Sequence, residues 1–534
     1  MKRFELGKLS IDVFGGWKEI GGNQILLSST SGSLLLDFGK SFGRWNRYFT
    51  EFLGPRSGFG IRDLLFLNLL PPLPGLYRDT EHDTVFVSAD DKALLSMSGL
   101  DGERVLGLLL SHAHLDHTGA IAYLRSDLPI VTSAATAAII KAMQDTGQAG
   151  LDGEIAYLSA RGLSDEGLLL SQGDSYQRRP LHLVHGQVPQ DFAATSPAKT
   201  KKIEGAPWSE FAGKLGPFEV EAFPVDHSVP GAVAFGVHTE EGLVVYTGDL
   251  RRHGRWAQKT EAFIQTLSQR EVSLLIIEGT RLGRSSKTYT EHQVRDALRN
   301  LIAQHPKAPV VVDFAPRNLE RMLSCMEVGR DLKRTLVITP KDAYLLLALS
   351  EVDQTWKQLL GDVLVIKEKR VRRPYWEEIV WNNGSVRPVG LEEVASHPDG
   401  FLLAFGFFEL NRLIDLRLAE ERRGVAGREG IYVFSNSYWA DDEQVLDLQV
   451  LLNWLKALNF RVYPEALNRL PRDPSLVDNP YHTSGHAPTE DLVDLVRQVR
   501  PRYLLPVHTE AAHRWRKLLK GEQTKVLLAG KRRR

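Results

Sequence analysis

The sequence predicts a multidomain α/β protein, on the basis of its length, its composition and the order of its elements. The chain has 534 residues, which is more than one compact domain usually holds. Apolar residues make up 43% of the chain and charged residues 25%, as in globular proteins, which excludes global disorder. Short apolar runs with β-branched residues alternate with helical stretches and loops, so strands and helices are both expected.

Strands prevail in the first part of the chain. Short apolar or alternating runs predict strands at residues 24–27, 33–36, 105–110, 218–223, 233–237 and 244–247. Residues 38–104 form a long connection with a proline cluster. A connection of this length is expected to be a functional loop or to carry helices of its own.

After about residue 285 the pattern changes to strand–helix–strand. Predicted strands at residues 310–314 and 336–339 flank a predicted helix at 318–325, and the rhythm continues at 431–434 and 445–458. This alternation indicates a parallel sheet and therefore a separate α/β domain. We expect one domain formed by residues 1–284 and 471–534, with a second domain, residues 285–470, inserted into it.

Charge and cysteine content exclude several classes of protein. Lys and Arg together number 66, as do Asp and Glu, so the chain is not a polycation that binds nucleic acid by bulk charge. The single cysteine, Cys325, excludes an intrachain disulfide and a cysteine-based zinc site, and it favours a reducing compartment. No apolar run has the length of a signal peptide core or a membrane span, so a cytoplasmic protein is expected.

The segment His112-Ala113-His114-Leu115-Asp116-His117 carries the sharpest chemical signal. Imidazole and carboxylate groups suit zinc, and a catalytic zinc ion takes about three protein ligands and keeps one position open. His112 and His114 are two residues apart, so in an extended segment both side chains point the same way. Asp116 and His117 follow within one turn of loop and can reach a second ion.

The remaining ligands must come from other strand ends, where loops converge on a rigid sheet. His227, Asp249 and His508 each follow a predicted strand and are the candidates. Asp37 also ends a strand and can orient a ligand imidazole from outside the ligand set. Taken alone, each of these residues fits a purely structural role equally well.

As an ordered set, these residues resemble the four motifs of the metallo-β-lactamase superfamily. Further residues resemble the extra motifs of its β-CASP nuclease branch: Glu278 after an apolar run, His486 in His482-Thr483-Ser484-Gly485-His486, and His508 after Pro506-Val507. This form is most similar to RNase J. The resemblance implies a metallo-β-lactamase αββα sandwich with an inserted α/β β-CASP domain, which is built on a parallel sheet.

The resemblance also implies an activity, a metal content and a role for each residue. The enzyme would hydrolyse RNA phosphodiester bonds with two zinc ions, as a 5′-exonuclease, an endonuclease or both. His112, His114 and His227 would hold one ion, Asp116, His117 and His508 the other, and Asp249 would bridge them. His486 would be the general acid, oriented and kept protonated by Glu278, so the expected catalytic residues are Asp116, Asp249, Glu278 and His486.

Contacts to RNA are expected at four further residues. Pro488 and the apolar spacing of residues 492–499 predict a helix that starts just after His486, and helix N-termini favour anions. His482 and Ser484 are expected to contact phosphate there, although a simple N-capping turn also explains them. Arg317 and Asn318 are expected to contact RNA in the cleft between the domains. The basic stretch 367–376 fits either phosphate contacts with base stacking or a solvated linker.

The sequence leaves other functions open. A dizinc hydrolase of a small ester or thioester would use the inserted domain as a lid, but it has no evident need for His486 and Glu278. A β-CASP DNA nuclease is less favoured than an RNase, because by the same resemblance DNA-directed members carry valine where this chain has His508. A scaffold without activity is least favoured, because every ligand position holds a competent residue. Single-stranded RNA is the expected partner, and no membrane partner is expected. An oligomer is possible, although the stretch after His508 is too short for the dimerisation domain of bacterial RNase J.

Overall fold

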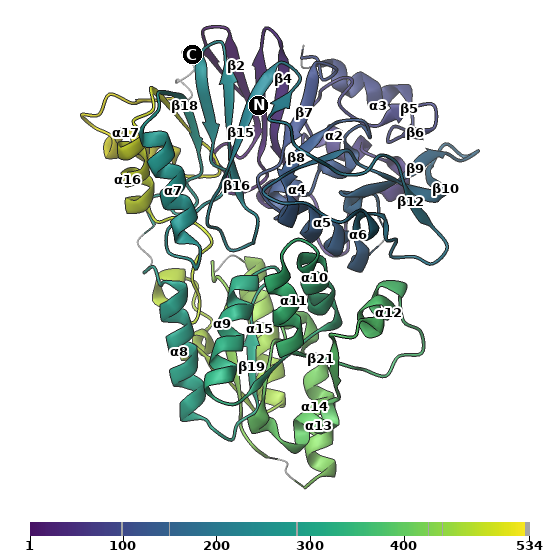
Figure 1. The fold of residues 1–534 in the computed structure, drawn as a ribbon, viewed down its shortest axis with the longest axis vertical. Helices are drawn as coiled ribbons and strands as arrows, with labels where there is room; N and C mark the ends of the chain where they lie inside the picture. Colours follow the sequence, from purple (N-terminus) through teal and green to yellow (C-terminus); the bar gives the residue numbers. More distant parts are fainter. Residues whose placement is uncertain (98–99, 149, 285–286, 425–426, 440–441, 529–534) are drawn as a thin grey trace. The chain divides into compact units, whose positions relative to one another are not determined.

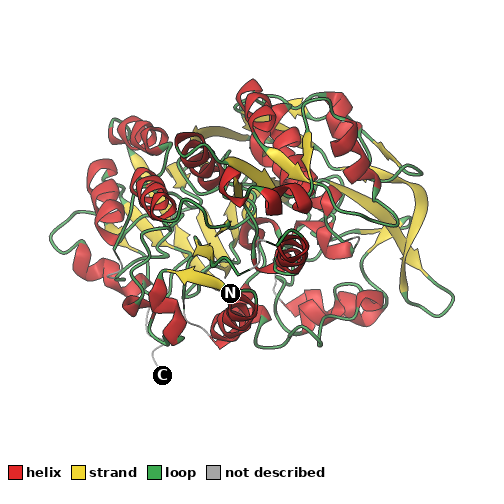
Figure 2. Cartoon of the chain, turned by 90° about the horizontal axis from the view of Figure 1, so that it is seen from below, coloured by secondary structure: helices red, strands yellow, loops and turns green. Residues whose placement is uncertain are grey.

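The computed structural model describes residues 1–97, 100–148, 150–284, 287–424, 427–439 and 442–528 (Figure 1). The chain divides into two compact units, and both combine helices with strands (Figure 2). The first unit consists of Met1–Arg252, Ala257–Arg284 and His486–Arg534; the second consists of His253–Trp256 and Ser285–Gly485. The second unit thus extends past residue 470, where the sequence analysis placed its end. Among the described residues, no helix combines the length and the hydropathy needed to span a bilayer.

Two sheets form the framework of the first unit. The eight-stranded sheet has the order β1 (Lys2–Leu6), β2 (Leu9–Gly15), β3 (Gln24–Ser29), β4 (Gly32–Phe38), β7 (Val105–Leu109), β8 (Ile130–Ser133), β11 (Leu181–Val184) and β13 (Ser209–Glu210). The seven-stranded sheet has the order β14 (Lys214–Leu215), β15 (Phe218–Pro224), β16 (Val233–Thr239), β17 (Gly242–Tyr246), β18 (Val272–Ile277), β26 (Tyr503–Pro506) and β27 (Lys525–Val526). The predicted strands in this part of the chain are confirmed.

Apolar side chains between the two sheets form the core that fixes their positions. Ile11, Leu34, Phe235 and Val244 belong to this cluster and are at most 1% exposed. Burial of each such side chain contributes about 1.5–3 kcal/mol to stability, so this core holds the strand ends in place.

Helices cover the outer faces of the sandwich (Figure 1). The second sheet packs against α7 (Ala257–Ser268), α16 (Thr489–Val499) and α17 (Trp515–Leu518), with the ring of Trp515 fully buried. Helix α5 (Ala134–Thr146) contacts β8 and β11 of the first sheet. The arrangement is the αββα sandwich that the sequence predicted. Helix α16 begins one residue later than expected, because Pro488 is its N-cap rather than its first helical residue.

Two long connections in the first unit carry short elements of their own. Residues 38–104 contain α1 (Phe42–Trp45), η1 (Ser57–Phe59), α2 (Arg62–Phe66), β5 (Asp79–Thr80), β6 (Asp83–Thr84), α3 (Ala89–Ala93) and η2 (Leu94–Met97). The connection between β8 and β15 adds a three-stranded sheet of β12 (Lys202–Glu204), β10 (Leu169–Arg178) and β9 (Tyr157–Leu163), along with α6 (Gln190–Ala194). Both connections are therefore structured rather than bare loops.

The second unit has a single parallel sheet flanked by helices. Its order is β22 (Arg387–Val389), β21 (Leu364–Ile366), β20 (Thr335–Ile338), β23 (Phe401–Leu403), β19 (Val310–Asp313), β24 (Gly430–Phe434) and β25 (Phe460–Tyr463). Every pairing in this sheet is parallel, which confirms the predicted α/β domain. Its helices are α8 (Glu291–Gln304), α9 (Leu319–Asp331), α10 (Pro340–Ser350), α11 (Gln354–Asp362), α12 (Tyr375–Asn382), α13 (Leu391–Ser396), α14 (Arg412–Arg422) and α15 (Asp442–Ala457).

Strand direction determines where the loops of the first unit gather. Strand β4 is parallel to β7, and β17, β18 and β26 are parallel to one another. Parallel neighbours end at the same edge of their sheet, so the segments that follow β4 and β7 lie together, as do those that follow β17, β18 and β26. These segments carry most of the predicted site residues: the motif from His112 to His117 follows β7, Asp249 follows β17, Glu278 follows β18 and His508 follows β26, while His227 follows β15.

Candidate metal centre and active site

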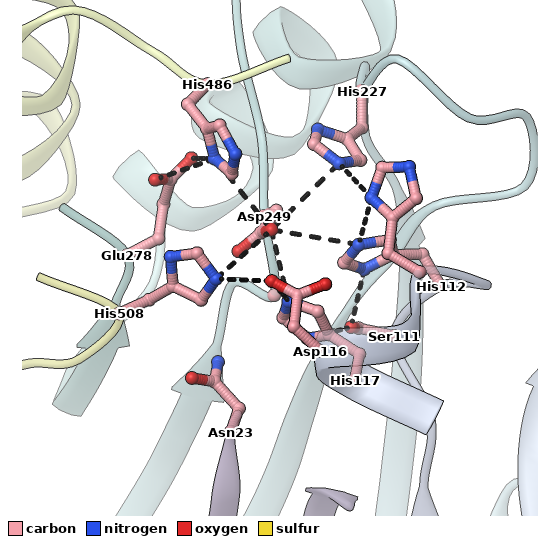
Figure 3. A network of polar contacts seen from close by, with 12 residues as sticks. Asn23, Ser111, His112, Asp116, His117, His227, Asp249, Glu278, His486 and His508 are labelled. Carbon is pink, nitrogen blue, oxygen red and sulfur yellow. Dashed lines mark hydrogen bonds and ion pairs between the residues drawn. The ribbon is translucent and has the colours of Figure 1, made fainter. Parts of the chain in front are cut away.

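A dense cluster of histidines and carboxylates lies at the carboxyl ends of these strands (Figure 3). Among the described residues it contains three groups whose potential ligand atoms lie within 4.8 Å of one another, and the third, Asp249, Glu278, His486 and His508, shares two residues with the second. The first group is His112, His114 and His227; the second is Asp116, His117, Asp249 and His508. All seven residues that the sequence predicted as metal ligands are therefore brought together, within a single unit of the chain.

The spacing within the first group suits zinc. Nε2 of His112 and Nε2 of His227 each lie 3.1 Å from Nδ1 of His114. At Zn–N distances of about 2.0–2.1 Å, tetrahedral geometry puts ligand atoms about 3.3–3.4 Å apart. The three nitrogens therefore face a common point at nearly the spacing that one zinc ion requires.

Asp249 occupies the centre of the cluster. Its Oδ2 atom lies 3.1 Å from Nε2 of His117, 3.7 Å from Nε2 of His112 and of His508, and 4.0 Å from Nε2 of His227. In the described part of the structure, the buried Oδ1 atom of Asp249 has no hydrogen-bond partner. A buried carboxylate oxygen without a donor is costly, and a cation beside it removes that cost. The donor set and this oxygen both fit zinc.

The charge states of His112 and Asp116 favour metal binding as well. Burial, together with the neighbouring histidines, lowers the pKa of His112 well below its usual value, so its ring is neutral and offers a lone pair. Burial alone would raise the pKa of Asp116, but His117 and His508 outweigh it and lower that pKa, so the carboxylate is ionised. Neutral imidazole and ionised carboxylate are the forms that bind metal ions.

Residues outside the ligand set hold the rings in place. Oδ2 of Asp37 lies 2.6 Å from Nδ1 of His117 and accepts hydrogen bonds from Oγ of Ser111 and the hydroxyl of Tyr246, both at 2.6 Å. Fixing Nδ1 of a histidine directs its Nε2 atom, which is how such partners orient metal ligands. Sequence reasoning missed Ser111 and Tyr246, although the place of Ser111 directly before the histidine motif was a usable signal.

His508 is fixed in the same way. Oγ1 of Thr280 lies 2.7 Å from Nδ1 of His508, while Nε2 of His508 lies 3.1 Å from Oδ2 of Asp116. The backbone of His508 has a φ of 51°, a left-handed conformation that residues other than glycine adopt at a cost. Thr280 was also missed by sequence reasoning. It lies 228 positions away in the chain.

His486 and Glu278 form a pair beside Asp249. Nδ1 of His486 lies 3.2 Å from both carboxylate oxygens of Glu278 and 3.8 Å from Oδ2 of Asp249. The backbone N–H groups of Leu250 and Thr280 donate to Glu278, at 3.2 and 3.1 Å. Burial would lower the pKa of His486, but Glu278 and Asp249 outweigh it and raise that pKa to about 9. At neutral pH His486 therefore carries a proton.

The four residues predicted to contact RNA belong to the second unit. His482 uses both ring nitrogens there: Nε2 lies 2.9 Å from Oγ of Ser437, and Nδ1 lies 3.2 Å from the carbonyl oxygen of Ser435. The carbonyl of Ser484 accepts a hydrogen bond from His253 at 3.0 Å. The side chain of Asn318 caps α9, and Arg317, which precedes it, is half-buried. Their role in binding RNA stays a prediction.

One part of the interpretation of residues 367–376 is wrong. Trp376 is buried against Tyr344, with ring centroids 5.9 Å apart, so it does not offer a face for base stacking. Arg370 and Arg373 both form ion pairs with Glu377, which reduces the positive charge of the stretch. Apolar packing decides the position of Trp376 here, and the linear sequence does not reveal it.

Family comparisons agree with this geometry. Residues 83–306 match the family described as metallo-beta-lactamase superfamily, and residues 477–527 match the Zn-dependent metallo-hydrolase RNA specificity domain. Residues 83–306 therefore carry a metallo-β-lactamase domain. The second match covers His482, His486 and His508. The two domains and the relatives described below are consistent with a β-CASP protein similar to RNase J.

The similar curated proteins are named Ribonuclease J. The proteins from Pyrococcus abyssi and Methanocaldococcus jannaschii are 21% and 22% identical to this chain; the alignments cover 95% and 94% of it, and 91% of each relative. The protein from Corynebacterium glutamicum is 21% identical over 77% of this chain. The chain spans about half of that bacterial relative's length: the alignment covers 46% of the relative.

A solved structure supports the fold. The crystal structure of a protein of unknown function from Enterococcus faecalis V583 matches with a TM-score of 0.64 and 20% identity. The match covers 98% of both chains. At this level of identity it supports the arrangement of the elements and says nothing about activity.

Zinc is expected to stabilise this protein measurably. Binding at a free zinc concentration about 1,000 times the Kd adds about 4 kcal/mol to the free energy of unfolding. The unit that holds the site has about 330 residues, and at an unfolding entropy of about 2.1 cal/mol/K per residue this gain corresponds to an increase of about 6 °C in the midpoint of thermal unfolding. Calorimetry on the metal-free protein with added Zn²⁺ measures this shift. Ca²⁺, which prefers six to eight oxygen ligands, is the control and should have little effect. An unchanged midpoint with Zn²⁺ would contradict the metal assignment.

Proposed function

We propose that this metallo-β-lactamase protein is a dizinc β-CASP ribonuclease of the RNase J type, which hydrolyses phosphodiester bonds of single-stranded RNA. The observation that carries the proposal is the pair of His486 and Glu278, 3.2 Å apart, beside the buried carboxylate of Asp249. A protonated imidazole next to the ligand cluster suits a reaction in which an oxygen leaves and needs a proton. The names of the similar proteins point to the same substrate.

Each ligand group has a place in this proposal. His112, His114 and His227 would hold one zinc ion, and Asp116, His117 and His508 the other, with Asp249 shared between them. Bound zinc ions supply Lewis acidity and lower the pKa of the water that they bind. Asp37 and Thr280 keep His117 and His508 oriented, through their contacts at Nδ1 of each ring.

His486 is assigned the role of proton donor. Its Nδ1 atom faces Glu278, so Nε2 is the nitrogen that delivers the proton to the leaving oxygen. Glu278 keeps the ring oriented and protonated. His482, Ser484, Arg317 and Asn318 are proposed as contacts to RNA, because loops at the ends of strands commonly carry such residues.

The test is cleavage of matched single-stranded RNA and DNA by the zinc-loaded protein. The substrates carry 5′-monophosphate, triphosphate or hydroxyl ends, and labels at either end identify the products. Mononucleotides released from RNA with a 5′-monophosphate would show a 5′-exonuclease, and internal fragments that do not depend on the end group would show an endonuclease. Cleavage of DNA alone, or no cleavage by fully zinc-loaded protein, would overturn the proposal; in the second case esters and thioesters are the next substrates.

Glu278→Gln is expected to change the pH dependence of cleavage. The proposed reaction needs protonated His486, whose pKa is raised by the neighbouring Glu278, so the wild-type rate should fall at alkaline pH. Removal of the Glu278 charge lowers the pKa of His486, and the falling limb should move toward neutral pH, with a loss of about tenfold or more at pH 8. Rates measured between pH 6 and 10 test this. Glu219→Gln, at an exposed site on β15, is the matched control and should keep the wild-type profile.

A further inference from the structure

The second unit contains a cavity that the proposed reaction does not use. Its volume is about 360 Å³, within the range of about 300–1,000 Å³ that is typical of small-molecule sites. Residues that follow β19, β20, β23 and β24 line it, and helix α15 contributes Leu448 and Leu451. All of the lining residues belong to this unit.

The topology of the sheet explains the place of the cavity. From β19 the chain moves outward through β20 and β21 to the edge strand β22, then returns to β23 beside β19 and continues to the opposite edge through β24 and β25. The direction of winding reverses at β23. In open α/β sheets, ligands bind at the carboxyl ends of the strands where this reversal occurs.

The walls of the cavity are aromatic. Phe314, Phe407, Phe408, Phe434 and Tyr438 line it, and the rings of Phe407 and Phe408 lie 5.5 Å apart in an edge-to-face arrangement. Phe408 is 90% exposed although it is a large apolar side chain. Aromatic faces attract organic cations and pack against apolar bodies.

The charged groups of the cavity are mainly acidic. Asp313, Asp342, Glu409 and Asp447 line it, and of the described lining residues only Lys341 is basic. A Cβ atom placed on Gly406 would lie 3.2 Å from Oε2 of Glu409 and 3.4 Å from Oδ1 of Asp313, so both carboxylates face the same point. Oε2 of Glu409 already accepts a hydrogen bond from the backbone N–H of Gly406 at 3.0 Å, and Oδ1 of Asp313 accepts one from Asn436 at 2.8 Å; Glu409 also pairs with Arg412 at 3.5 Å. Each carboxylate oxygen can accept a second hydrogen bond and cannot donate one, so the pair selects a ligand with N–H donors.

Burial disfavours the ionised form of two of the carboxyl groups that line the cavity. It raises the pKa of Asp313 to about 6, and the charge of Glu409 adds to the effect against the hydrogen bonds from Tyr432 and Asn436. Burial and Glu409 likewise raise the pKa of Asp342 to about 6. A bound cation lowers the free energy of the ionised carboxylates. The same charges repel phosphate groups, which disfavours nucleotides.

From the cavity, its aromatic walls and its converging carboxylates, we propose that the second unit binds a small organic cation, an amine, amidine or guanidinium carried on a flat or apolar body. The charged head would lie between Glu409 and Asp313, beside Gly406, and the body would pack against Phe407 and Phe434. This site does not depend on the proposed ribonuclease activity, because it shares no residue with the zinc ligands or with His486.

The experiment is calorimetric titration of the zinc-loaded full chain with three isosteric probes: benzamidine, benzamide and benzoate. Benzamidine is expected to bind at least about tenfold more tightly than neutral benzamide, because charge-assisted hydrogen bonds are the stronger kind. Benzoate should not bind. Equal affinity for benzamide, or tighter binding of benzoate or GMP than of benzamidine, would overturn the proposal.

Two variants locate the site by different means. Glu409→Gln removes one charge, and Gly406→Ala leaves every charge in place but adds a methyl group next to both carboxylates. Each should weaken benzamidine binding about tenfold or more. Glu429→Gln, at an exposed ion pair with Arg461 in the same unit, is the matched control and should bind like the wild type. Unchanged binding in both cavity variants would overturn the assignment. RNA cleavage, measured in the same samples, reports on the proposed function separately.

Discussion

Asp249→Asn is expected to abolish RNA cleavage, with a loss of at least about 10³-fold, and to remove most of the bound zinc. The reason is the position of Oδ2, which lies within 4.0 Å of ring nitrogens from five histidines, including His117 at 3.1 Å and His486 at 3.8 Å. The amide has nearly the same shape but no charge, so the change tests the charge and leaves the packing in place. Zinc content per chain and single-turnover cleavage rates measure the two effects.

The control for this variant is Asp494→Asn on α16, where the carboxylate is half-exposed and pairs with Arg252. It should keep both zinc and activity. If Asp249→Asn retained two zinc ions per chain and a rate within about tenfold of the wild type, the assignment of Asp249 as a shared ligand would be wrong.

His486→Ala should lower the rate of cleavage by about 10²–10⁴-fold, the usual contribution of a general acid, while zinc stays bound. His486 contacts Glu278 and Asp249 and forms a third group of candidate ligands with these two residues and His508, but the proposal assigns no zinc ion to that group. The loss should fall on kcat more than on KM, because a proton donor acts in the transition state. Substrates with a better leaving group should recover part of the rate, since they need less help from an acid.

His238→Ala serves as the matched control. His238 also pairs with a glutamate in the first unit, Glu221 at 2.8 Å, but its side chain is exposed on β16. It should cleave RNA at the wild-type rate. A His486→Ala variant that lost zinc together with activity would indicate a ligand rather than a proton donor.

Sequence reasoning predicted those features whose cause is local. The motif from His112 to His117 can be recognised because its ligands are neighbours in the chain. The buried strands can be recognised because a short apolar run such as Val310–Asp313 has few alternatives to strand structure. The contacts of Asp37 with Ser111 and of Thr280 with His508 join residues 74 and 228 positions apart. Single-sequence patterns carry no signal for such pairs.

The extent of the second unit illustrates the same limit. The sequence predicts that residues 471–534, with their short histidine-bearing loops, belong to the first domain. In the structure, His482 contacts Ser435 and Ser437, and Thr483 donates to the carbonyl oxygen of Tyr289, so this loop is packed into the second unit. The cavity was missed for a related reason: its walls come from the ends of four strands that are separate in the sequence.

The first unit is formed by three separate segments of the sequence, so its parts are synthesised at different times. Strand β26 and His508 complete the sheet and the ligand set, yet they leave the ribosome about 260 residues after Asp249. At translation rates of about 5–20 residues per second, the delay is roughly 10–50 s. During that time β18 has no neighbour on one side, and an unpaired strand edge is a site for aggregation. The metal centre is therefore complete only after β26 and His508 have been synthesised.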